Sequence, residues 1–242
     1  MNRTSFRTLG TMLDCSRNAV PNLETLKKWV ELTASLGFNT LLLYTEDTYE
    51  LPDEPYFGYM RGRYTQQELR ELDAYACAHG MTLIPCIQTL GHMARALRWP
   101  CMEDVRDTDD VLLLDEEKTY ALIEEMIVSA SRPFATRRIH IGMDEAYGLG
   151  RGQYMDRHGY VPQSELMQKH LARISDILKK HGVSVACCPA SNLKLASGYA
   201  NIPKMLEKGI NIALGTDGAA SNNNLNIFQD IYLFGVVYKG FY

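Results

Sequence analysis

The stretch that decides the fold is residues 65–89, "TQQELRELDAYACAHGMTLIPCIQT". It opens on Thr65 with Glu68 three positions later, the pattern of a capping box at a helix N-terminus. Gly80 closes the amphipathic segment, and glycine commonly follows the last residue of a helix. An apolar run begins at once, and near-continuous apolar runs are typical of strands buried on both faces. The stretch therefore predicts a helix that leads directly into a strand of a parallel sheet.

The same strand–helix unit recurs on both sides of this stretch. The predicted strands are residues 11–16, 38–46, 81–89, 137–143, 183–190 and 210–216. The predicted helices are residues 22–37, 65–80, 115–134 and 164–182, with a further helical stretch after each of the last two strands. This alternation is typical of α/β proteins. We interpret it as a (βα) TIM-type barrel or partial barrel with about six visible βα units. A doubly wound open sheet is the alternative.

Six units leave an open edge where a closed barrel has about eight strands. An unpaired parallel edge favours pairing with another copy, so we expect a homo-oligomer. The tail at residues 231–242, "IYLFGVVYKGFY", is unusually apolar and aromatic for a final helix. We expect it to cover the gap or to form an interface.

Composition narrows the class of protein. The chain has 242 residues, 46% hydrophobic and 22% charged, with a net charge of −4. These values fit one large or two small globular domains and give no attraction to nucleic acid or to anionic membranes. No apolar run approaches the roughly 18 residues that a membrane span needs. Residues 1–18 contain no long apolar core, so we expect no export by a signal peptide. The six cysteines form no C-x-x-C pair. We expect reduced, buried thiols in a cytoplasmic protein.

Polar side chains follow each predicted strand. In (βα) barrels the chemistry lies at the C-terminal ends of the strands, so these residues are expected to share one rim. The alternative for any one of them is that it caps the next helix. In chain order they are Asp14, Ser16, Arg17, Asn18, Glu46, Asp47, Gln88, His92, Asp144, Glu145, Ser191, Asn192 and Asp217.

Three of these rim segments resemble one enzyme family. Residues 140–146, "HIGMDEA", resemble the His-x-Gly-x-Asp-Glu signature of glycoside hydrolase family 20, the β-N-acetylhexosaminidases. "MLDCSRN" resembles the first strand of that family, with its sugar-binding arginine, and "QTLGHM" resembles its third-strand histidine loop. The resemblance runs over about residues 8–182. We therefore expect residues 1–182 to form the hexosaminidase-like part of the barrel.

The resemblance implies substrate-assisted, retaining hydrolysis of terminal N-acetylhexosaminides, without a cofactor. In this scheme the sugar's own 2-acetamido oxygen is the nucleophile, an exception to the two-carboxylate mechanism. Glu145 would protonate the glycosidic oxygen, which needs a carboxyl still protonated near neutral pH, and would later activate water. Asp144 would stay ionised, orient the acetamido nitrogen and stabilise the oxazolinium ion. The alternative for this pair of acids is a charge pair at a helix N-terminus.

The other substrate-binding candidates are Asp14, Arg17, His92 and His140. Arg17 would offer a donor fork to the hydroxyls of a small carbohydrate. His140 has an alternative as a buried core histidine of its strand. Neighbouring residues of a strand point in opposite directions, so the chain must turn at residues 144–145 for both acids to face one sugar.

A second resemblance begins after residue 182. Residues 215–225, "GTDGAASNNNL", and residues 188–195, "CPASNLKL", resemble the C-terminal part of an amidohydrolase barrel of the methylthioadenosine/S-adenosylhomocysteine deaminase type. That family implies a metal-binding role for Asp217. The chain has no His-x-His motif, and one carboxylate does not hold a transition metal. We therefore expect no metal unless an amidohydrolase-type site exists at Asp217.

Two resemblances in one barrel-sized chain suggest a chimera. We expect residues 183–242 to be an amidohydrolase-like part, packed with residues 1–182 as one domain. The aromatic walls that hexosaminidases place on later strands have no match after residue 183. Trp99 is interpreted as a loop aromatic near the barrel mouth. Three hypotheses follow: a β-N-acetylhexosaminidase-like glycosidase, a hybrid barrel scaffold with little activity, and a metal-dependent amidohydrolase (deaminase).

Overall fold

The computed structural model shows two compact units that divide between Gln153 and Tyr154. The structure describes residues 8–17, 19–181, 185–194, 202–207, 209, 212–216, 222, 224 and 226–241. The expected boundary at residues 182–183 falls inside the second unit, and the packing of the two parts as one domain stays a prediction.

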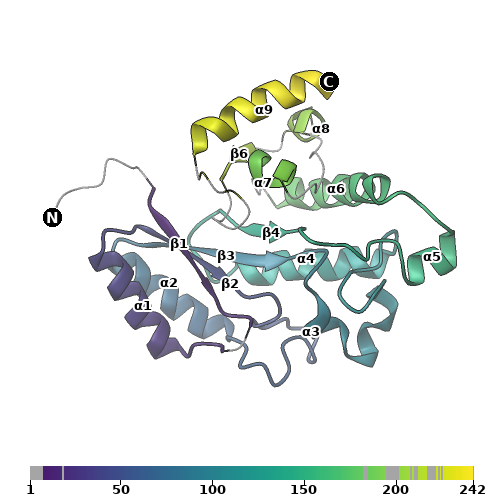
Figure 1. Cartoon of the computed structure of the whole chain (residues 1–242). Helices are drawn as coiled ribbons and strands as arrows, with labels where there is room; N and C mark the ends of the chain where they lie inside the picture. The colour runs from purple at the N-terminus through teal and green to yellow at the C-terminus, as the bar shows by residue number, and fades with distance from the viewer. Residues whose placement is uncertain are drawn as a thin grey trace. The chain divides into compact units, whose positions relative to one another are not determined.

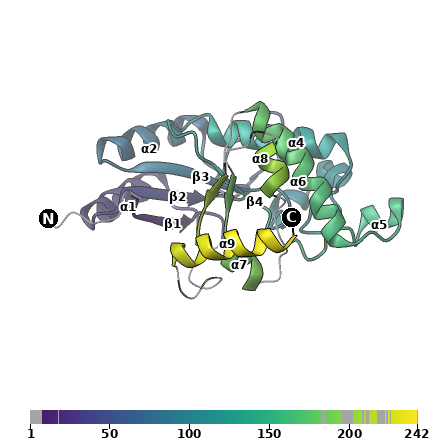
Figure 2. The ribbon, with the colours of Figure 1, turned by 90° about the horizontal axis from the view of Figure 1, so that it is seen from above.

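The first unit is built on a four-stranded parallel sheet (Figure 1). Its strands are β1 (Gly10–Asp14), β2 (Thr40–Tyr44), β3 (Thr82–Gln88) and β4 (His140–Gly142). They pair in the order β1-β2-β3-β4, and Figure 2 shows β1, β2 and β3 side by side. Successive right-handed crossovers in this order place every connecting helix on the same face of the sheet. A doubly wound sheet needs a point where the order reverses, so the order observed here is that of a (βα) barrel.

The helices of the first unit begin and end largely where the sequence predicts. They are α1 (Leu23–Ser35), α2 (Gln66–Ala78), α3 (Ala94–Leu97), the 3-10 helix η1 (Pro100–Val105) and α4 (Glu117–Ser131). The Oδ1 atom of Asn22 accepts the N–H of Thr25 at 2.9 Å, and Thr65 and Glu68 form the expected capping box. The short helices α3 and η1 lie in the long connection after β3 and were not predicted.

The strands supply the core of this unit. Leu41 and Leu43 of β2 and Leu83 and Ile87 of β3 are fully buried. Such side chains each contribute roughly 1.5–3 kcal/mol relative to exposure. β1 lies at the edge of the sheet and is only partly covered, with Met12 about half exposed. The interior strands therefore hold the sheet, and their C-terminal ends are rigid supports for the side chains that follow.

The second unit contains a parallel pair of short strands and five helices among its described residues. These elements are α5 (Gln153–His158, which begins at the last residue of the first unit), α6 (Gln163–Lys180), β5 (Val185–Cys187), α7 (Pro189–Lys194), α8 (Ile202–Glu207), β6 (Ile212–Leu214) and α9 (Ile227–Phe241). Cys187, Ile202 and Met205 form its small apolar core. The C-terminal helix α9 exposes Phe228 and Tyr232.

All six cysteines are free thiols. Cys15, Cys86 and Cys187 are buried in or next to strands, as expected, but Cys77 and Cys101 are exposed. Those two lie in α2 and η1, whose outer sides face solvent, so the prediction of burial was wrong for them. No helix in the described part of the chain is long and apolar enough to span a bilayer.

Candidate functional site

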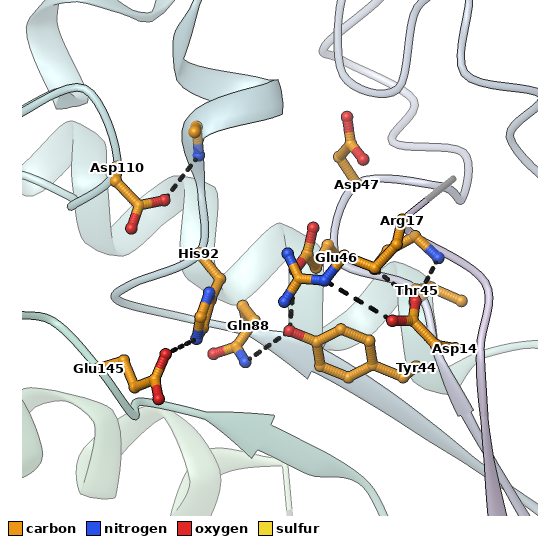
Figure 3. A network of polar contacts seen from close by, with 12 residues as sticks. Asp14, Arg17, Tyr44, Thr45, Glu46, Asp47, Gln88, His92, Asp110 and Glu145 are labelled. Carbon is orange, nitrogen blue, oxygen red and sulfur yellow. Dashed lines mark hydrogen bonds and ion pairs between the residues drawn. The ribbon is translucent and has the colours of Figure 1, made fainter. Parts of the chain in front are cut away.

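The C-terminal ends of β2, β3 and β4 carry one connected network of polar side chains (Figure 3). The amide of Gln88 donates through Nε2 to the Tyr44 hydroxyl at 3.0 Å and to Oδ1 of Asp144 at 3.1 Å. The Tyr44 hydroxyl in turn donates to Oε1 of Glu46 at 2.9 Å. Three neighbouring strands therefore place their terminal side chains on a common rim.

Both acids of the "HIGMDEA" segment meet one histidine. Nε2 of His92 lies 3.4 Å from Oδ2 of Asp144 and 3.4 Å from Oε2 of Glu145. Each carboxylate side chain is about half exposed, whereas the His92 side chain is mostly covered. The structure therefore brings together three of the predicted site residues, and solvent reaches both carboxylates.

An unusual backbone conformation aims these side chains. Glu145 has φ 52°, His92 has φ 56° and Glu46 has φ 44°, all in the left-handed region that non-glycine residues rarely adopt. The turn expected at residues 144–145 is therefore made by Glu145 itself, directly beyond β4. Left-handed non-glycine residues cost of order 1–3 kcal/mol and cluster at functional sites. Three of them on one rim indicate that side-chain placement outweighs backbone preference here.

Two glycines allow the side chains and loops of the network to approach each other closely. A Cβ atom on Gly142, the glycine of "HIGMDEA", would lie 2.3 Å from Oε1 of Gln88. A Cβ atom on Gly91 would lie 2.7 Å from the backbone oxygen of Asp144. Without side chains at these positions, the Gln88 amide lies across β4 and the His92 loop packs onto the strand end. The glycine of the motif thus has a packing explanation.

Asp107 holds the loop that follows Glu145. This buried carboxylate accepts the backbone N–H of Gly150 at 2.6 Å and of Gly152 at 3.2 Å. The backbone oxygen of Asp107 accepts the N–H of Gln153 at 3.0 Å. These bonds fix the path of the chain beyond the two acids, so Glu145 lies between a strand end and an anchored loop.

Arg17 and Asp14 form the opposite side of the network. Nη1 of Arg17 lies 2.9 Å from Oε1 of Glu46, and Nε lies 3.6 Å from Oδ2 of Asp14. Asp14 also accepts the N–H and the hydroxyl of Ser16 through Oδ1, each at 2.8 Å. The Arg17 guanidinium lies 5.8 Å from the centre of the Tyr44 ring. Arg17 is thus held by two carboxylates while half of its side chain stays exposed.

The pKa values of the network residues shift in different directions. Burial alone would raise the pKa of Asp144, but the contacts with His92 and Gln88 outweigh it and lower the pKa to about 2. The contact with the Asp144 carboxylate raises the pKa of His92, although partial burial acts against it. Burial raises the pKa of Glu46, and the Tyr44 hydroxyl and Arg17 oppose that effect. Asp144 is therefore ionised at neutral pH.

A small cavity of about 140 Å³ opens beside this network. Arg17, Glu46 and His92 contribute to its wall, together with Arg95 and Asp110. Oδ1 of Asp110 accepts the N–H of Ala94 at 3.1 Å, which anchors the start of α3. Sequence reasoning did not identify Tyr44, Arg95 or Asp110 as site residues. The tyrosine at the end of the apolar run "TLLLY" was the one available signal, because it is the strand's polar terminus.

Three other predicted residues, His140, Asn18 and Asp217, are not among the described members of the network around His92. His140 is the first residue of β4 and is exposed, so its alternative as a core histidine is wrong. Because β4 is the last strand of its sheet, no further strand of that sheet covers it. Nδ1 of His140 accepts the backbone N–H of Gly142 at 3.3 Å, within its own strand. Asn18 and Asp217 lie outside the described residues.

A transition-metal site needs three or four convergent ligands, often including histidines. His79, His158, His170 and His181 lie in helices or at their ends. Among the described residues, no group of three or more His, Cys, Asp and Glu side chains is arranged to hold a metal ion. Asp217, which the amidohydrolase resemblance implies as a metal ligand, lies outside the described residues, and the described side chains by themselves do not fit a metal.

Sequence comparison relates part of the chain to amidohydrolases. The Amidohydrolase family matches residues 124–237, from within α4 into α9. The 5'-deoxyadenosine deaminase of Methanocaldococcus jannaschii is 43% identical over 100 residues, which are 40% of this chain and 24% of that enzyme. The 5-methylthioadenosine/S-adenosylhomocysteine deaminase of Dictyoglomus thermophilum is 48% identical over 100 residues, 39% of this chain and 23% of that enzyme. The chain thus spans about a quarter of the length of these relatives.

Comparison of the fold with solved structures finds similarity to hexosaminidases. The family 20 exo-β-N-acetylglucosaminidase from Vibrio harveyi, solved with N-acetylglucosamine, superposes with a TM-score of 0.66 at 21% identity. That match covers 87% of this chain and 41% of the enzyme. A chitobiase from Flavobacterium johnsoniae gives a TM-score of 0.64 at 21% identity, over 87% of this chain and 38% of that one.

The fold is of the TIM-barrel type. Both sets of similar proteins agree on this class, which confirms the expected parallel α/β architecture. At this level of identity the structural likeness shows the fold alone. By their names, the two sets of similar proteins catalyse different reactions, deamination and glycoside hydrolysis.

Proposed function

We propose that the first unit acts as a β-N-acetylhexosaminidase-type glycosidase. The observation that carries the proposal is the convergence of Asp144 and Glu145 on Nε2 of His92, at the exposed ends of parallel strands. The substrate class is a terminal N-acetylhexosaminide, hydrolysed with retention by participation of its own acetamido group. The superposition on family 20 enzymes supports the proposal at the level of fold.

The proposal divides the two acids by their surroundings. Asp144 is ionised because its neighbours lower its pKa to about 2, so it is suited to hold the acetamido N–H and to stabilise the positive oxazolinium ion. Glu145 gives its proton to the glycosidic oxygen as the bond to the leaving group breaks. It then takes a proton from the water that opens the oxazolinium ring. His92 positions both carboxylates, and Arg17 and Asp14 supply hydrogen bonds to sugar hydroxyls.

A test compares turnover of an aryl N-acetylglucosaminide by the unaltered chain and by Glu145→Gln. The variant should lose about 10²–10⁴-fold in kcat, the range expected when general acid–base catalysis is removed. Glu24→Gln is a matched control, because Glu24 is an exposed residue of α1 that pairs with Lys28. Equal turnover by Glu145→Gln and the unaltered chain would contradict the proposal.

A second candidate function is deamination by an amidohydrolase-type site. The 43% identity to a deaminase over 100 residues favours it. Its test is ammonia release from 5'-methylthioadenosine, together with zinc that remains bound after dialysis. Because the described histidines do not fit the metal, we rank it below the glycosidase. A chain that unfolds cooperatively but turns over neither substrate would be the hybrid scaffold.

A further inference from the structure

A second polar cavity lies at the other end of the first unit's sheet, away from the candidate site. Its volume is about 560 Å³, and it is lined by Thr8, Asn39, Thr40, Thr82 and Arg138. Thr40 and Thr82 are the first residues of β2 and β3, and Arg138 lies two residues before β4. The candidate site, by contrast, follows the last residues of these strands. The cavity therefore lies at the amino-terminal ends of the strands, and we call it the lower cavity.

Hydrogen bonds of Asn39 fix the wall of the lower cavity. The N–H of Asn39 donates to the backbone oxygen of Leu9 at 2.9 Å, and its Oδ1 accepts the N–H of Leu9 at 2.9 Å. The backbone oxygen of Asn39 accepts the N–H of Thr82 at 2.9 Å. Asn39 thus ties together the starts of β1, β2 and β3. A cavity fixed in this way needs little rearrangement to receive a ligand, which lowers the cost of binding.

Two threonines of the lower cavity are cross-strand neighbours. Thr40 and Thr82 are register partners in the parallel pair of β2 and β3, so their side chains lie on the same face of the sheet. Gly10 is the partner of Thr40 on β1, and a Cβ atom there would lie only 3.3 Å from Cβ of Thr40. The Thr40 hydroxyl donates to Oδ1 of Asn39 at 3.2 Å. No hydrogen bond joins the Thr82 hydroxyl to another described residue, so its proton is available to a ligand.

Arg138 gives the lower cavity a positive charge. It is exposed, and it forms no ion pair with a carboxylate of the described residues. Its backbone N–H donates to Oγ1 of Thr136 at 3.2 Å, which holds the turn before β4. No Asp or Glu is among the described residues that line the cavity. A guanidinium without a carboxylate partner, next to hydroxyl groups, attracts an anion.

We propose that the lower cavity binds a phosphate group, either free or carried on a small molecule. The Arg138 guanidinium can donate two parallel N–H bonds to phosphate oxygens, and threonine hydroxyls can donate to another oxygen. A volume of about 560 Å³ lies in the usual range of small-molecule sites, so an organic part fits beside the phosphate. This site and the proposed glycosidase site lie at opposite ends of the same strands, and neither proposal depends on the other.

The test titrates the full chain with glucose 6-phosphate, inorganic phosphate and glucose by calorimetry. Salt at about 0.15 M screens general charge attraction. We expect both phosphates to bind and glucose not to bind. Tighter binding of glucose 6-phosphate would assign the site to a phosphate ester, and equal binding would assign it to the free ion. Both results support the proposal.

Arg138→Gln should weaken phosphate binding about tenfold or more, because a charge-assisted pair is lost. Arg137→Gln is the matched control, since it removes the same charge one residue away from the cavity lining. Thr82→Val removes one hydroxyl and should weaken binding about threefold.

NMR of the backbone amides locates the bound phosphate. The signals of Thr40 and Thr82 should move with glucose 6-phosphate, whereas those of Tyr44 and Gln88, at the other ends of the same strands, should stay. Three results would overturn the proposal. The first is no heat and no amide shift with either phosphate. The second is equal weakening by Arg138→Gln and Arg137→Gln, which would show general charge attraction. The third is a set of shifts confined to Tyr44 and Gln88, which would place the phosphate at the candidate site instead.

Discussion

Each unit holds a carboxylate through several polar contacts, but Asp144 in the first unit and Asp230 in the second are held differently. Asp230, in α9, is fully buried and accepts the backbone N–H of Ala190 at 2.9 Å and the Asn222 amide at 3.0 Å. Asp144 is about half exposed and is held by the side chains of Gln88 and His92. Asp230 thus satisfies the start of α7, whereas Asp144 faces a titratable group and solvent. The buried carboxylate in helix α9 of the second unit therefore serves packing, whereas the carboxylate beyond β4 of the first unit is available for chemistry.

The largest expected effect tests the structural side of this comparison. Asp230→Ala leaves the Ala190 N–H and the Asn222 amide without their buried acceptor, which should cost about 3 kcal/mol of unfolding free energy. Asp144→Ala, at a half-exposed position, should cost about 1 kcal/mol or less. Denaturant unfolding measures both, and hydrogen exchange of the peptide 189–194 locates the first. Equal losses in the two variants would remove the distinction.

A glycine substitution tests how tightly the first unit is packed around its network. Gly142→Ala places a Cβ atom on the Gln88 amide, so we expect a loss of about 2 kcal/mol from overpacking. The displaced amide should also leave Asp144. Gly235→Ala in α9 is the control, since a Cβ atom there meets nothing within 4 Å. It should stabilise its helix by roughly 0.5–1 kcal/mol. A neutral Gly142→Ala would show that the Gln88 side chain moves freely.

The smallest effect concerns the titration of His92. Asp144→Asn removes the carboxylate that raises the pKa of His92, so that pKa should fall. The sign of the stability effect follows from both groups. The lowered pKa of Asp144 stabilises the folded chain fully above the unfolded pKa of about 4. This stabilisation is lost as the pH falls toward about 2. The raised pKa of His92 stabilises the folded chain fully below the unfolded pKa of about 6.5. This stabilisation is lost as the pH rises through the raised pKa of the folded state.

The stabilisation of the native chain over Asp144→Asn should therefore be greatest between about pH 4 and about pH 6.5. NMR titration of His92 measures the first effect, and unfolding across the pH range measures the second. A stability difference that stays constant from pH 3 to pH 8 would contradict the assignment of an ionic contact.

Local signals in the sequence predicted the fold class well. Thr65 with Glu68, Asn22 and Gly80 mark helix ends through bonds and backbone angles that depend on a few neighbouring residues. The strand order in the first unit also follows from successive units with right-handed crossovers. The short helices α3 and η1 were not predicted, because the long connection after β3 has no extended periodic pattern.

The sequence predicted part of the candidate site, namely the residues that local patterns place just after a strand. The rim positions of Asp144, Glu145, His92 and Arg17 follow from strand ends. The Tyr44–Gln88–Asp144 chain of hydrogen bonds joins three strands whose side-chain directions and relative register no local pattern specifies. The exposure of Cys77 and of His140 likewise depends on what covers a helix face or a sheet edge.

The left-handed conformation of Glu46, His92 and Glu145 has a consequence for laboratory evolution of this chain. Glycine adopts such angles without steric penalty, so replacing any of the three relieves local backbone strain. A screen for thermal tolerance alone would then enrich glycine at these positions and discard the imidazole and the carboxylates. Selection for robustness and selection for turnover would pull the same three codons in opposite directions.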